Sequence, residues 1–467
     1  MKLTRNIFAL SLVAMAITGC NDSAQNEEET IIAPDEETIV IDPYVVVDTS
    51  QFDNFNNENA MSEPLYGEQF YGQDAQTTTT LPDYVDNSDG TVSDYNTGLM
   101  WAKTPDLNDD GVINIDDKFS YDELLVKAEE STLGGYDDWR LPTIKELYSL
   151  MDFNGTDPST SGGLECPSDG DLPPEGGTPP EGELPPECSG EGTEPLPVAE
   201  PIENIPFIDT NYFDFAYGDL DAGERTVDSQ YATTNLYVAN TTDDGGRTLF
   251  GVNFADGRIK GYGLTLFGQD KVFSAMFVRG GTEEGEQYGI NSFTDNEDET
   301  ITDQATNLMW SKDDSLESMT WSEALAWVQT KNEEGYLGYS DWTLPDAKQL
   351  QSIVDYSRSP DTTDSPALDP LFNSTIIINE AGQDDYAAYW SSTTHINVSP
   401  MPGSAAVYIN FGRAMGFMNG EWGDVHGAGA QRSDPKIGNP ADFPEGFGPQ
   451  GDAIRISNFV RMVRQTN

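Results

Sequence analysis

Apolar residues recur at helical spacing in two stretches of the chain, residues 119–130 and 320–330. Each stretch begins at a Ser or Thr that is followed three residues later by Glu. These pairs are Ser120 with Glu123 and Thr320 with Glu323. Such a pair forms a capping box, in which two side chains satisfy amide groups that the first helical turn leaves unpaired. The pattern therefore predicts an amphipathic helix in each stretch.

Two shorter helices are predicted just after Leu-Pro pairs, because proline is tolerated at the start of a helix and not within it. They open at Thr143-x-x-Glu146 and Asp346-x-x-Gln349. The later part of each half has the pattern of short strands with Gly and Asn turns, at residues 248–262, 271–279, 405–413 and 455–464. Two helices followed by antiparallel strands predict an α+β fold for each half.

These elements occur twice because the sequence contains an internal repeat. Residues 84–103 align without a gap on residues 293–312, and GYDDWRLPTIKEL (135–147) aligns on GYSDWTLPDAKQL (338–350). Three further matches join Tyr231-Ala-Thr-Thr to Tyr389-Trp-Ser-Ser, residues 250–262 to 407–417, and Val278-Arg279 to Val463-Arg464. Five matches in the same order indicate a duplication. We expect two tandem homologous domains, residues 81–280 and 288–467, joined by a Gly- and Glu-rich linker.

The charge balance limits the partners of the protein. The chain has 82 Asp and Glu against 23 Lys and Arg, a net charge of −59. Such a chain is repelled by phosphate backbones, so a role in nucleic-acid binding is excluded. Adaptation to saline water would also explain the acidity, because dissolved salt screens the repulsion between the negative charges. Hydrophobic residues make up 37% of the chain, which is too many for wholesale disorder.

The first twenty residues have the features of a secretory signal peptide, with Lys2 and Arg5 before an apolar run and small residues after it. The run is too short to span a bilayer core of roughly 30 Å. Ile17-Thr18-Gly19-Cys20 resembles a bacterial lipobox, which implies lipidation of Cys20 and, with Asn21 following, an outer-membrane location. The alternative is ordinary cleavage beside an incidental Cys. Residues 21–80 contain no Lys or Arg, and we expect an acidic, disordered tether.

The first domain carries an insertion rich in Pro, Gly and Glu between Cys166 and Cys188. Its composition cannot build a core, so we expect an irregular or polyproline-like loop. In an oxidising compartment the two cysteines at its ends are able to form a disulfide, and the alternative is two free thiols.

Residues 106–117, DLNDDGVINIDD, fit a calcium-binding loop. The predicted ligands are Asp106, Asn108, Asp110, the carbonyl of Val112, Asn114 and Asp117, and Gly111 supplies the sharp turn at position 6. Calcium takes six to eight oxygen ligands, so the carboxylates converge only if the chain wraps around the ion. The loop resembles that of dockerin repeats, and the alternative is a solvated acidic turn. The predicted cofactor is therefore calcium, bound in the first domain only.

The strings GLMW, GYDDWRLPTIKEL, NFADGRIKGY and FVR resemble the Lcl C-terminal domain family, which is named after a collagen-like bacterial adhesin. The resemblance extends over both copies and implies an adhesin-like module with a distant similarity to C-type-lectin-like and formylglycine-generating-enzyme-like folds. It also implies a glycan ligand. Sulfated glycans require a basic surface, which is the opposite of this charge balance unless calcium bridges the anions.

Few cations are available as ligand-binding residues, and the candidates are Arg140, Arg258 and Lys260. The alternative for Arg140 is an ion pair with Glu146 that holds the strand-to-helix corner. The tryptophans of the repeated strings are expected in the core: Trp101, Trp139, Trp310 and Trp342. His395 and His426 stand in Ser/Thr- and Gly-rich surroundings and are interpreted as incidental.

These observations predict a lipid-anchored outer-membrane protein, exposed at the cell surface or to the periplasm, that acts as a calcium-stabilised binding or adhesion module. Its expected partners are extracellular glycans or envelope proteins. One alternative is a structural envelope component. Another is a hydrolase of envelope polymers, although the chain contains neither G-x-S-x-G nor H-E-x-x-H and is not expected to be an enzyme.

Overall fold

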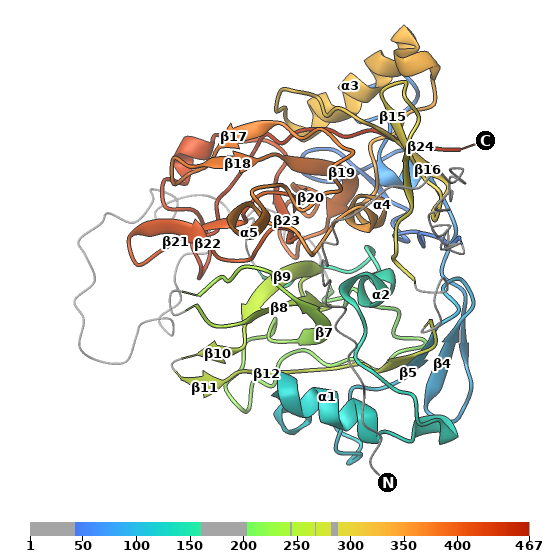
Figure 1. The fold of residues 1–467 in the computed structure, drawn as a ribbon, viewed down its shortest axis with the longest axis vertical. Helices are drawn as coiled ribbons and strands as arrows, with labels where there is room; N and C mark the ends of the chain where they lie inside the picture. Colours follow the sequence, from blue (N-terminus) through green and yellow to red (C-terminus); the bar gives the residue numbers. More distant parts are fainter. Residues whose placement is uncertain (1–42, 160–202, 243–244, 267, 282–287, 467) are drawn as a thin grey trace, which may run out of the picture. The chain divides into compact units, whose positions relative to one another are not determined.

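The protein is described here by a computed structural model, which places residues 43–159, 203–242, 245–266, 268–281 and 288–466 (Figure 1). The predicted signal peptide, Cys20, the first part of the predicted tether and the insertion between Cys166 and Cys188 lie outside these residues. These described residues belong to one compact unit. It is mixed, with few helices and many antiparallel strands, in keeping with the predicted α+β class.

The described part of the first copy of the repeat, residues 81–280, contains a four-stranded antiparallel sheet in the order β13-β5-β4-β3 and two α-helices. Its elements are β3 (Tyr84–Asp86), β4 (Thr91–Asp94), β5 (Met100–Ala102), η2 (Ile115–Asp117), β6 (Phe119–Ser120), α1 (Tyr121–Glu130), η3 (Leu133–Gly135), α2 (Ile144–Ser149), β7 (Gln230–Leu236), β8 (Thr248–Asn253), β9 (Arg258–Gly263), β10 (Thr265–Leu266), β11 (Gln269–Asp270), β12 (Val272–Phe273) and β13 (Val278–Arg279).

The second copy contains a matching four-stranded sheet in the order β14-β15-β16-β24. Its elements are β14 (Phe293–Asp295), β15 (Thr300–Asp303), β16 (Leu308–Ser311), α3 (Trp321–Glu334), η5 (Tyr336–Gly338), α4 (Ala347–Ser352), α5 (Pro360–Thr363), β17 (Ile376–Ile378), β18 (Asp384–Tyr386), β19 (Ala388–His395), β20 (Ala405–Asn410), β21 (Met415–Met418), β22 (Glu421–Asp424), β23 (Gln431–Pro435), η6 (Pro440–Asp442) and β24 (Val463–Gln465).

The predicted helices are confirmed, and each begins with the capping box that the sequence indicated. Helices α1 and α3 are capped by Ser120 and Thr320, and helices α2 and α4 by Thr143 and Asp346. Helix α3 continues beyond the predicted stretch and ends at Gly335, whose φ of 64° is the left-handed conformation typical of a helix C-terminus. The capping residues predicted from the sequence therefore cap the helices of the folded protein.

The two copies share one six-stranded antiparallel sheet, in the order β19-β20-β23-β9-β8-β7 (Figure 1). Strands β9 and β23 meet at its centre, where Ile259 lies opposite Gln431. Within its own copy Ile259 pairs with Val252, and Gln431 pairs with Ile409. Val252 and Ile409 are equivalent in the repeat, so the junction is self-complementary, as in a two-fold symmetric dimer interface. The duplicated chain forms an internal pseudo-dimer.

The structure differs from the sequence alignment at one of the five matches. Residues 258–262 align in sequence with 413–417, but the strand that pairs with β20 and occupies the place of β9 is β23. Residues 415–418 instead form β21, one strand of a separate hairpin with β22. Strands share a period of two whatever their partner, so a short match identifies a strand without fixing its position in a sheet.

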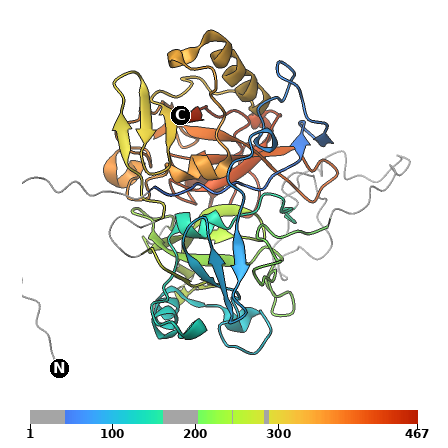
Figure 2. The ribbon, with the colours of Figure 1, turned by 90° about the vertical axis from the view of Figure 1, so that its right-hand side faces the viewer.

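Residues 43–80 also differ from the predicted disordered tether. They form the short strands β1 (Asn54–Phe55) and β2 (Ala60–Met61) and the helix η1 (Asp74–Gln76). The amide of Gln51 donates to the carbonyl of Thr394 at 2.8 Å, and Phe55 is 4% exposed. In Figure 2 this blue segment lies beside the orange second copy. Composition suggested a solvated tether, but scattered apolar side chains and long-range hydrogen bonds hold the segment on the fold.

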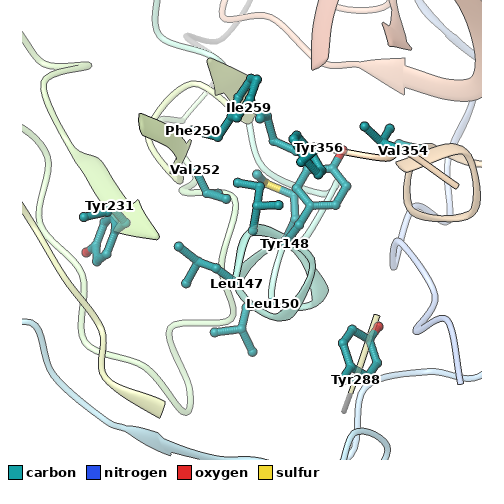
Figure 3. Packing of buried hydrophobic residues seen from close by; sticks show 14 of the residues in the cluster. Leu147, Tyr148, Leu150, Tyr231, Phe250, Val252, Ile259, Tyr288, Val354 and Tyr356 are labelled. Atoms are coloured by element: carbon teal, nitrogen blue, oxygen red, sulfur yellow. The ribbon is translucent and has the colours of Figure 1, made fainter. Parts of the chain in front are cut away.

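The hydrophobic core is continuous between the copies. Phe250 of β8 and Tyr356, which follows α4, pack edge to face with ring centroids 4.8 Å apart, and Tyr148 and Val354 lie beside them (Figure 3). The predicted core position of the repeated tryptophans is confirmed, because all are at most 3% exposed: Trp101, Trp139, Trp310 and Trp342. Burial of aromatic surface dominates the packing energy of such a core.

Candidate functional site

The acidic loop at residues 106–117 wraps tightly and leads into helix α1. The carboxylate of Asp106 accepts hydrogen bonds from the amides of Asp110 and Gly111, at 3.3 and 2.8 Å. At the other end of the loop Asp117 is 2% exposed and accepts from the amides of Leu107 and Asn114, at 2.9 and 3.0 Å. Gly111 has a φ of 83°, as the predicted sharp turn requires.

The oxygen-rich composition of this loop fits a hard divalent cation. Asn108 and Asp110 each accept one backbone amide within the loop, and Asn114 caps the short helix η2. In the part of the chain that the structure describes, however, no group of three or more His, Cys, Asp or Glu side chains is placed so that it could hold a metal ion. The carboxylates are turned toward loop amides, and calcium binding stays a prediction.

Arg140 lies at the strand-to-helix corner in front of α2. Its guanidinium forms two hydrogen bonds with Glu146, at 2.8 and 2.6 Å, and a third with the carbonyl of Gly280 at 2.9 Å. Glu146 is 2% exposed and also accepts from the amide of Thr143. This ion pair is the alternative that was predicted from the sequence. It gives Arg140 a structural role, which is to hold the strand-to-helix corner before α2.

Arg258 and Lys260 belong to a network between the copies. Arg258 on β9 pairs with Asp157 at 2.7 Å and donates to Ser433 on β23 at 2.8 Å. Lys260 pairs with Asp256 at 3.0 Å. Burial opposes ionisation of Asp157, but Arg258 and His395 outweigh it and keep the pKa of this carboxyl low. Both predicted ligand-binding cations are therefore engaged inside the fold.

The two histidines are not incidental, and that interpretation is wrong. Both side chains are fully buried, and each contacts a carboxylate: His395 lies 3.3 Å from Asp157, and His426 lies 3.0 Å from Asp452. Burial lowers the pKa of each imidazole. His395 also stacks on Phe207 with ring centroids 5.3 Å apart. Their sequence surroundings gave no signal, because the partners lie far away along the chain.

A surface feature that the sequence reasoning missed occurs once in each copy, and we call this pair the outer corners. In the first, Arg279 of β13 covers the ring of Tyr136 at 3.8 Å and pairs with Asp138 at 2.6 Å. In the second, Arg464 of β24 lies 4.0 Å from the ring of Tyr339 and pairs with Asp341 at 2.8 Å.

The outer corners present carboxylates to solvent. The side chains of Asp138 and Asp341 are 48% and 53% exposed, and hydrogen bonds from the arginines lower the pKa of each. Each arginine lies on the strand that pairs with the tryptophan strand of its own four-stranded sheet. The signal was present in the sequence, since the tyrosine, the aspartate and the arginine all fall within matched strings of the repeat.

Comparison with known proteins gives one match. The family model described as the Lcl C-terminal domain matches residues 90–272 and 299–426, one copy in each half. No curated protein and no solved structure matches the chain. Among the described residues, no helix has the length and apolar character needed to cross a membrane.

Proposed function

Since the chain belongs to the Lcl C-terminal domain family, we propose that it is a cell-surface binding or adhesion module that presents two equivalent ligand-contact sites. The main observation behind this proposal is that each copy has one outer corner and that the two copies share one six-stranded sheet. Two linked sites raise avidity by about 10²–10⁴ without any new contact, provided that a ligand engages both.

The chemistry of the outer corners favours an uncharged or amino-sugar glycan as ligand. Exposed carboxylate oxygens accept hydrogen bonds from sugar hydroxyl or ammonium groups, and a tyrosine offers an apolar ring with a polar tip. A net charge of −59 repels sulfated glycans. The glycan, the lipid anchor at Cys20, the outer-membrane location and the C-type-lectin-like character belong to this proposal.

Calcium is proposed as a structural cofactor of the first copy. Asp106, Asn108, Asp110, Asn114, Asp117 and the carbonyl of Val112 would hold the ion. When bound, the ion would neutralise the acidic loop and fix its connection to α1. Extracellular calcium modules bind at roughly 10⁻⁴–10⁻³ M, which suits a stabilising role.

Binding of the mature chain, from Cys20 or Asn21 onward, to an array of neutral, amino-sugar and sulfated glycans tests the function. The variants Asp138→Asn and Asp341→Asn, made singly and together, remove one or both exposed carboxylates. Both carboxylates are about half exposed, and asparagine keeps a side-chain oxygen that accepts a hydrogen bond from the arginine, so these variants should fold. We expect each single variant to lose about 10²-fold in avidity and the double variant to lose binding.

Asp221→Asn is the matched control, because Asp221 is an exposed turn residue of the first copy outside the corners. Binding that survives in the double variant would refute the assignment of the corners. If no glycan binds and crosslinking on intact cells captures envelope proteins alone, the structural envelope role is favoured. Conversion of an envelope polymer that one carboxylate substitution abolishes would favour a hydrolase.

A further inference from the structure

Two lysines at equivalent positions of the repeat face each other across the junction of the copies. Lys145 of α2 donates to the carbonyl of Ser352 at 2.6 Å, and Lys348 of α4 donates to the carbonyl of Ser149 at 2.8 Å. Ser352 and Ser149 are the last residues of α4 and α2. Each lysine therefore caps the C-terminal end of the helix of the other copy, where a positive charge is favourable.

Neither lysine has a counter-ion in contact. Within the described ranges no carboxylate oxygen lies within 4.0 Å of either Nζ. Lys348 is 3% exposed, and Lys145 is partly buried. Burial lowers the pKa of each lysine to about 8, which more distant carboxylates such as Asp303 and Asp152 offset only in part. Two ammonium groups in a buried place without a paired anion are costly.

Both lysines line a pocket at the junction of the copies, which we call the junction pocket. Tyr44, Tyr148 and Tyr288 also line it. Its free space has room for about one water molecule. In the part of the chain that is described, the buried hydroxyl groups of Tyr44 and Tyr148 have no hydrogen-bond partner. Tyr148 is 1% exposed, so an unsatisfied hydroxyl there also costs free energy.

The lysines keep donor capacity for a ligand. A lysine ammonium has three N–H donors. Lys145 uses two on Ser352 and Asn291, and Lys348 uses two on Ser149 and Asp48. One N–H therefore remains on each lysine, and two tyrosines that line the same pocket have hydroxyl groups without a partner among the described residues.

We propose that the junction pocket binds one monovalent, halide-sized anion, chloride in natural surroundings, which compensates Lys145 and Lys348. Phosphate, sulfate and carboxylate metabolites are larger than a halide ion, and the pocket has no room for them. The walls come from both copies, from the segment that contains Tyr44 and from the segment that contains Tyr288. Binding would therefore stabilise the joined fold by mass action.

Thermal unfolding of the full mature chain in sodium chloride, sodium bromide and sodium gluconate at equal ionic strength tests the proposal. We expect a higher melting temperature in chloride and bromide than in gluconate, because gluconate does not fit. In Lys348→Met the apparent halide affinity should fall at least about tenfold. Lys331→Met, on α3 and outside the pocket, should keep the wild-type response.

Bromide soaked into crystals of the wild-type chain gives a direct second readout that does not depend on the folding of a variant. The expected result is an anomalous peak between the Nζ atoms of Lys145 and Lys348. Equal melting temperatures in all three salts would overturn the proposal. So would a water without anomalous signal at this position, or a bromide peak without any effect on melting, which would indicate binding at crystal concentration only.

Discussion

Asp346 shows how one side chain combines a local role with a place in a buried network. It caps helix α4 by accepting the amide of Gln349 at 2.8 Å, as Thr143 does for helix α2. Unlike Thr143, it is an acid and is 5% exposed. Burial raises its pKa to about 7, with a further contribution from Asp48. Burial and the charge of Asp346 also raise the pKa of Asp74, so the two carboxyls titrate as neighbours.

This pKa predicts a pH dependence of stability. Because the folded pKa lies above the unfolded value of about 3.9, the contribution of Asp346 is complete below that value and is lost as the pH rises to about 7. The slope is about 1.4 kcal/mol per pH unit in between. Asp346→Asn keeps the helix cap and removes the ionisation. Its melting temperature relative to wild type should therefore rise from pH 4 to about pH 7 and stay level above.

Melting curves of both proteins across this pH range measure the effect. The control variant Asp221→Asn gives the effect of removing an exposed carboxylate. A pH-independent difference between Asp346→Asn and wild type would contradict the prediction.

At the scale of elements, the acidic loop and helix α1 form one continuous unit. Asp117 bonds to amides at both ends of the loop, and Ser120 begins the capping box of α1 three residues later. Lys118, between them, pairs with Glu224 at 2.6 Å and so ties the loop to the later part of the copy. An ion bound in the loop would therefore restrain α1 as well.

Calcium is expected to stabilise the full chain through this unit. At calcium concentrations of 10 to 100 times the dissociation constant, the gain is about 1–3 kcal/mol. Asp106→Ala should lose the calcium-dependent rise in melting temperature, because the carboxylate at position 1 of the loop is missing. The measurement is a calcium titration followed by thermal melting.

Asp109→Asn is the control for this experiment. Asp109 lies in the same loop, is exposed, is not a predicted ligand, and has a φ of 60° that asparagine tolerates. The calcium loop is refuted if Asp106→Ala and wild type respond alike, or if neither responds.

At the scale of the whole molecule, the two copies depend on each other. The β9–β23 pair, the Phe250–Tyr356 contact and the reciprocal lysine bonds all cross between the copies. Residues 43–80 add contacts to both, since Gln51 donates to the carbonyl of Phe153 in the first copy and to that of Thr394 in the second. A separated copy would expose a strand edge and part of the core, which favours association.

Residues 43–281 and 288–466, produced as separate chains, should therefore form a one-to-one complex when co-expressed. Each chain alone should aggregate or pair with itself, because the junction is self-complementary. Light scattering gives the stoichiometry, and circular dichroism melting gives the cooperativity. The intact chain with an uncut protease site in its linker is the control. Two monomeric halves that each melt cooperatively at the wild-type temperature would disprove the dependence.

The local structure and the family of this protein were predictable from its amino acids alone. Capping boxes, Leu-Pro starts and the positive-φ glycine at position 111 depend on contacts within a few residues, so their patterns can be read directly. The buried tryptophans and the ion pair of Arg140 with Glu146 followed in the same way. The repeat and the family resemblance rest on matched strings, and the family match over both halves confirms them.

The contacts between distant residues were not predictable in this way, because they depend on how the whole chain packs. The pairing of β9 with β23, the ordered segment 43–80, the outer corners and the opposed lysines join residues that lie up to hundreds of positions apart. The alternation of apolar residues in a strand specifies which face is buried, but it does not specify which other strand will be its neighbour. Likewise, a charged residue in the sequence does not identify its ion-pair partner. The equivalence of Lys145 and Lys348 was visible in the repeat, but their meeting required the pseudo-two-fold packing of the copies.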